Sequence, residues 1–73
     1  MDKNKKSNDW AIITKNISDM VASSGKSKTQ IASEIGIVKS TLSQYLSGRA
    51  FPTLVTLKIL CKVLDCTYED ILN

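Results

Sequence analysis

Apolar residues recur at intervals of three and four along most of this chain, and glycine or proline interrupts the pattern at four places. This spacing puts apolar side chains on one face of a helix. No segment shows the period-two alternation that is typical of a half-buried strand. The interruptions fall at Gly25, Gly36, Gly48 and Pro52, residue types that favour helix ends and turns. The sequence therefore predicts an all-α fold, and 73 residues suit a single compact domain.

Five helices are expected from the periodicity and from residues that favour helix ends. The first begins at Asp9 and ends before Gly25, and the second opens at Ser27, where Ser27 and Gln30 fit a capping box. The third covers residues 39–47. The apolar positions of these three segments are Trp10, Ile13, Ile17, Met20, Val21, Ile31, Ala32, Ile35, Leu42, Tyr45 and Leu46.

Two further helices come after the turn around Pro52. The fourth begins at Thr53 as the N-cap, and its apolar stripe comprises Leu54, Leu57, Leu60, Cys61 and Leu64. The fifth is short: Thr67 and Asp70 resemble a capping box, and Ile71 and Leu72 supply its buried end.

The positive charge is unevenly distributed. Residues 1–8 contain three lysines against one acidic residue and show no helical period, so we interpret them as a flexible basic arm in front of a domain at residues 9–73. Residues 26–50 contain four basic residues and one acidic residue. This distribution predicts a surface in the middle of the chain that faces a polyanion.

Several classes of function are disfavoured by composition. The chain has no histidine and only two cysteines, Cys61 and Cys66, so it lacks a His-based acid–base pair, a Cys–His nucleophile and a complete zinc ligand set. The longest early apolar run, residues 10–13, is too short for a signal peptide or a membrane span. We therefore expect a cytoplasmic binding domain, not an enzyme, with no cofactor, no metal, no membrane contact and no evident small-molecule ligand.

Residues 28–45 are the most informative part of the sequence. They predict two short helices around a turn of about three residues that contains Gly36, which is the helix-turn-helix geometry. Ala32 is small where the two helices would cross, and Gly36 can adopt the positive φ of a sharp turn.

These two predicted helices, together with the segments on either side of them, resemble the Cro and phage-repressor (Xre-like) helix-turn-helix regulators. The resemblance covers residues 9–73 and rests on Ile31-Ala32, Ile35-Gly36-Ile37, Leu42, Tyr45, Ser47-Gly48-Arg49, Pro52, Leu57 and Leu64. It implies a compact five-helix, lambda-repressor-like fold with a central helix-turn-helix. It also implies that the helix of residues 39–47 enters the major groove of double-stranded DNA while the preceding helix crosses the backbone.

The candidate site residues divide into two sets. With Leu42, Tyr45 and Leu46 turned inward, the outward face of the third helix presents the residues that we expect to contact bases, and the resemblance places the same four at base-facing positions: Lys39, Ser40, Ser43 and Gln44. The helix starts and ends that would meet phosphate carry the second set: Lys26, Ser27, Lys28, Ser47 and Arg49.

Two functions are compatible with this interpretation. The first is a sequence-specific transcriptional regulator, a repressor, that binds a palindromic site as a homodimer, because one short helix reads few base pairs and two copies double the contacts. The alternative is a protein-interaction module, such as the antitoxin of a toxin–antitoxin pair.

Overall fold

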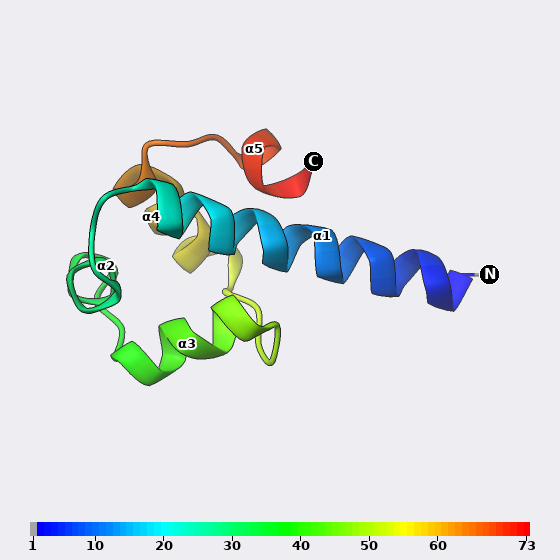
Figure 1. Ribbon diagram of the computed structural model, residues 1–73, viewed down its shortest axis with the longest axis horizontal. Coiled ribbons are helices and arrows are strands. Elements are labelled where there is room, and N and C mark those ends of the chain that lie inside the picture. The colour runs from blue at the N-terminus through cyan, green and yellow to red at the C-terminus, as the bar shows by residue number, and fades with distance from the viewer. Residues whose placement is uncertain (1) are drawn as a thin grey trace.

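The structure, a computed structural model, describes residues 2–73, and the expected all-α fold is confirmed for that part of the chain. Its helices are α1 (Asp2–Ser23), α2 (Lys28–Ile35), α3 (Lys39–Ser47), α4 (Leu54–Leu64) and α5 (Tyr68–Leu72). Helix α1 packs against both α3 and α5, and α2 packs against α3 and α4 (Figure 1). Each helix of the α2–α3 helix-turn-helix therefore packs against a helix outside the motif, α2 against α4 and α3 against α1.

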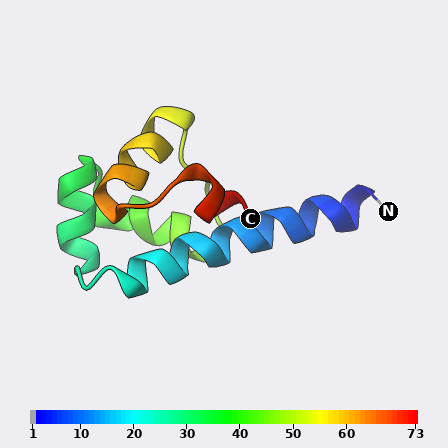
Figure 2. The same ribbon diagram turned by 90° about the horizontal axis from the view of Figure 1, so that it is seen from above.

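The first helix begins earlier than the sequence predicted. The expected start was Asp9, whereas α1 begins at Asp2 and continues through residues 2–8. This segment contains no glycine or proline, and a helix already held by packing extends at little cost per residue. As a result α1 reaches past the other helices (Figure 2), and the molecule measures 39 × 22 × 21 Å.

The predicted caps are confirmed at three helix starts. Ser27 Oγ accepts from the backbone N–H of Gln30 at 3.0 Å, and Thr53 Oγ1 accepts from that of Thr56 at 3.2 Å. Thr67 and Asp70 form the expected reciprocal capping box. The box predicted at Ser27 is incomplete, because the side chain of Gln30 donates forward to Glu34 and does not reach back to the cap.

The core takes one completely buried side chain from every helix. These five residues are Ile17, Ile31, Leu42, Leu60 and Ile71, each with no exposed surface. The predicted burial of Ala32, Ile35, Tyr45 and Cys61 is also confirmed. Each helix supplies only one of these five side chains, so no single helix could form the core alone.

Three apolar residues assigned to buried stripes lie at the surface. Leu54 is 80% exposed and occupies the first turn of α4, directly after the turn around Pro52. Leu72 ends α5 and is half exposed, and Trp10 is also exposed. Helical period alone assigns a face, but it does not show where along the helix that face meets a neighbour.

The two cysteines are free thiols in the structure, Cys61 buried and Cys66 partly buried. Burial, and after it the influence of the neighbouring Cys61, raises the pKa of the Cys66 thiol to about 11. The thiol is therefore protonated at neutral pH and a poor nucleophile. None of the helices that the structure describes has the length and apolarity needed to cross a membrane.

Candidate nucleic-acid interface

The turn between α2 and α3 fixes the angle of the two helices. Gly36 ends α2 in the left-handed conformation, with φ 91°, and its N–H donates to Ala32 O at 2.9 Å. The next N–H, that of Ile37, donates to the same carbonyl at 3.0 Å. Ala32 and Leu42 are buried, which lets the two helices pack closely against each other and the core.

With one face of α3 buried, its opposite face is open to solvent. Every residue predicted to contact bases lies on that open face: Lys39, Ser40, Ser43 and Gln44 are all exposed. Three of them, Ser40, Ser43 and Gln44, line a single shallow hollow of about 440 Å³ together with Ser47 and Arg49. The structure thus brings members of both predicted sets onto one surface.

Arg49 reaches this surface because of how α3 ends. Gly48 takes the left-handed conformation, and the N–H of Arg49 then donates back to Gln44 O at 3.0 Å. The reversal turns the chain so that the exposed Arg49 lies beside the open face of α3. A guanidinium at that place suits a phosphate, which it can contact with two parallel hydrogen bonds.

A second hollow, of about 480 Å³, joins this face to α1. It is lined by Ser18, Val21, Ala22, Lys28, Ser43, Leu46 and Ser47. Lys28, at the start of α2, therefore shares a surface with Ser43, Leu46 and Ser47 of the third helix. Ser18 and Ala22 of α1 also line this hollow and were not among the predicted site residues; their spacing of four, outside the apolar stripe, puts them on one face of α1.

Lys26 has a different environment from the other predicted phosphate contacts. Its Nζ donates to Glu34 Oε1 at 2.8 Å and to Val63 O near the end of α4 at 3.1 Å. Hydrogen bonds from Lys26 and then from Gln30 lower the pKa of Glu34 below its ordinary value. Lys26 and Glu34 thereby link the start and the face of α2 to the end of α4.

This link also shapes the charge of the candidate interface. Glu34 is the one acidic residue in 26–50, and Lys26 neutralises it. Within the described residues, Lys28, Lys39 and Arg49 take part in no ion pair. Three exposed cations therefore surround the open face of α3, and no unpaired acidic residue of segment 26–50 offsets their charge. This surface favours the binding of a polyanion.

A family model described as the Cro/C1-type HTH DNA-binding domain matches residues 16–73, from the second half of α1 to the end of α5. Neither the curated proteins nor the solved structures contain a match to the chain.

Proposed function

Since the chain belongs to the Cro/C1-type helix-turn-helix DNA-binding domain family, we propose that it is a transcriptional repressor that reads a specific double-stranded DNA site with α3 in the major groove. The observation that carries the proposal is the open face of α3, where four polar or basic side chains are exposed and unpaired acids are absent from the surrounding 26–50 segment. The proposed activity is binding in the cytoplasm, and it involves no catalysis and no cofactor.

The base contacts are assigned to Lys39, Ser40, Ser43 and Gln44. Lysine donates to the O6 and N7 acceptors of guanine, and glutamine pairs with adenine through one donor and one acceptor. Serine both donates and accepts, so it tolerates more than one base. We therefore expect Lys39 and Gln44 to carry most of the discrimination between sites.

The phosphate contacts are assigned to Ser27, Lys28, Ser47 and Arg49, which surround the same face. Backbone N–H groups at the start of α2 add donors that favour an anion. Lys26 was predicted to belong to this set. Because its Nζ already has two oxygen partners, we propose that it supports the motif by holding α2 against α4, while the other four meet the backbone.

We also propose that the protein acts as a homodimer on a palindromic site. Two recognition helices about 34–36 Å apart would double the contacts of one short helix. Several large apolar side chains on α4 and α5 are exposed and could form the dimer surface: Leu54, Val55, Tyr68 and Leu72. Burial of these side chains between two copies would contribute to dimerisation.

The proposal is tested by selecting bound duplexes from a random pool with the purified protein. We expect enrichment of a spaced palindrome. Lys39→Ala and Gln44→Ala should then each weaken binding to the selected site by about 1–3 kcal/mol and affect random duplexes less. Lys62→Ala is the matched control, because Lys62 is an exposed lysine on α4.

The possible outcomes separate the two functions. Equal losses for the α3 variants on selected and random DNA would contradict the assignment of base contacts. A pool that shows no enrichment would contradict specific DNA binding and would favour the alternative, a module whose exposed α4 and α5 surface binds another protein.

A further inference from the structure

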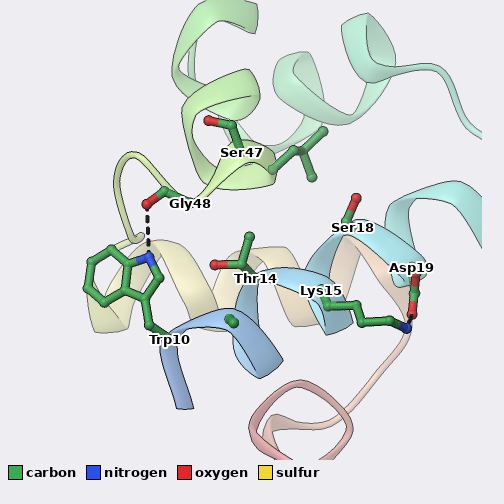
Figure 3. A pocket seen from close by; sticks show the side chains of 9 residues that line it. Trp10, Thr14, Lys15, Ser18, Asp19, Ser47 and Gly48 are labelled. Atoms are coloured by element: carbon green, nitrogen blue, oxygen red, sulfur yellow. Dashed lines mark hydrogen bonds and ion pairs between the residues drawn. The ribbon is translucent and has the colours of Figure 1, made fainter. Parts of the chain in front are cut away.

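Trp10 lies on α1 in front of the residues matched by the family model, yet its side chain contacts the end of α3. Its Nε1–H donates to Gly48 O at 2.8 Å across 38 positions of sequence (Figure 3). Its ring stacks on that of Phe51, with the centroids 3.8 Å apart and an interplanar angle of 16°. We call the arrangement of Trp10, Gly48 and Phe51 the Trp10 clasp.

The clasp holds the loop closely against α1. A Cβ placed on Gly48 would lie 3.3 Å from both Trp10 Nε1 and Thr14 Oγ1, so only a glycine fits without displacing them. Thr14 Oγ1 is buried and has no hydrogen-bond partner among the described residues. A buried hydroxyl without a partner costs free energy, and this cost accompanies the close contact between Thr14 and the loop.

Gly48, the residue that the clasp holds, is followed directly by Arg49. The clasp fixes the carbonyl of Gly48, and the adjacent N–H, that of Arg49, donates to Gln44 O at 3.0 Å. The backbone on both sides of the Gly48–Arg49 peptide bond is thus restrained, once from α1 and once from α3. Arg49 itself lines the hollow on the open face of α3.

We propose that Trp10 is a positioning residue for DNA binding: the clasp fixes the loop so that Arg49 is already directed at a backbone phosphate beside α3. This inference rests on the proposed function. A loop that must become ordered on binding reduces affinity, and restraining it beforehand removes that cost. The DNA-binding unit of this chain therefore begins at least six residues before the matched family region.

The test is a double-mutant cycle on the selected duplex, with Trp10→Ala and Arg49→Ala alone and together. Arg49→Ala should weaken binding about tenfold per subunit, the effect expected for one charged hydrogen bond. Trp10→Ala should weaken it by a similar or smaller factor in the wild-type chain and cause almost no further loss in the Arg49→Ala chain. Contacts that depend on one another are non-additive in this way.

Two further measurements separate positioning from stability. Each variant is measured at a temperature where far-ultraviolet circular dichroism shows it to be folded, and the salt dependence of binding is recorded. Trp10→Ala and Arg49→Ala should each reduce the log–log salt slope by about one per subunit, the effect of one lost phosphate contact. Trp10→Phe, which keeps a ring on Phe51 but removes the donor, should lie between Trp10→Ala and the wild type.

Ile12→Ala is the matched control, because Ile12 is a large apolar residue of α1 with an exposure similar to that of Trp10. It should leave both affinity and salt slope unchanged. Additive losses in the cycle, or an unchanged salt slope in Trp10→Ala, would overturn the inference and leave the proposed function intact. A wild-type chain that binds no duplex would overturn both.

Discussion

Gly48 is constrained both in its backbone conformation and in the space around it. Its φ of 80° lies in the left-handed region that disfavours side chains, and Trp10 and Thr14 lie close to the place where a Cβ would be. Gly25 has nearly the same backbone conformation, with φ 75°, but no atom lies within 4 Å of the place where its Cβ would be. Substituting the two glycines therefore separates the cost of the left-handed backbone from the cost of crowding a neighbour.

We expect Gly48→Ala to lower the free energy of unfolding by about 2 kcal/mol, roughly half from the left-handed backbone and half from crowding against Trp10 and Thr14. Gly25→Ala should lower it by only about 1 kcal/mol, since only the backbone term applies there. Urea denaturation measures both. Equal losses would mean that a Cβ at Gly48 is accommodated against Trp10 and Thr14 without cost.

Among the helices, α3 has an N-cap that does not use its side chain. Val38 occupies that position with an extended backbone, forms no capping hydrogen bond and is 65% exposed. Ser27, Thr53 and Thr67 all cap their helices through a side-chain oxygen. The helix proposed to read DNA therefore has a weaker start than α2, α4 or α5.

Val38→Ser should consequently raise the free energy of unfolding by about 1 kcal/mol, because serine supplies the missing acceptor at little cost in burial. Val55→Ser is the control: Val55 is also an exposed valine, 70% accessible, but it lies inside α4 and not at a cap. Thermal unfolding compares the two. A gain in Val55→Ser of the same size would show that the change of residue type, and not capping, stabilises the chain.

The sequence predicted those features of the elements that depend on neighbours within about four positions. The caps at Ser27, Thr53 and Thr67 and the inward face of α3 are of this kind. The forward hydrogen bond of Gln30 to Glu34 was missed because a second local partner competed with the cap. The start of α1 was missed because residues 2–8 lack an apolar stripe but also lack any residue that would stop a helix.

Contacts across the chain were not predictable from local patterns. The ammonium of Lys26 meets a carbonyl 37 positions away, and Trp10 meets one 38 positions away. Neither pair has a periodic signal, so the contact of Lys26 with α4 was not predicted, and Trp10 was placed on a buried stripe although its side chain is exposed. For the open face of α3 the sequence was sufficient to predict exposure, because burial of Leu42 and Tyr45 leaves only one orientation for that helix.

At the scale of the whole molecule, the core joins all five helices through one completely buried residue from each. The shortest helix, α5, contributes Ile71, and Asn16 Nδ2 of α1 donates to the carbonyl of the same residue at 2.8 Å. Even the last five-residue helix is therefore part of the common core. Such an arrangement favours cooperative unfolding in one step.

We expect Ile71→Val to lower the stability of the entire domain by about 1 kcal/mol, the usual cost of one buried methylene group. Urea unfolding monitored by Trp10 fluorescence and by far-ultraviolet circular dichroism should give coincident transitions, both shifted to lower urea. Leu72→Ala, at the neighbouring half-exposed position, should shift them less. Separate transitions for the two probes would mean that α5 unfolds independently.

The two faces of α3 share no residue, since Leu42 and Tyr45 are buried whereas Lys39, Ser40, Ser43 and Gln44 are exposed. Substitutions on the exposed face leave the core untouched. On the proposed function, related chains can thus diverge at these four positions and acquire new target sites while the core stays intact. Orthogonal regulators could be engineered by the same route, by exchanging only the exposed side chains of α3 over a constant core.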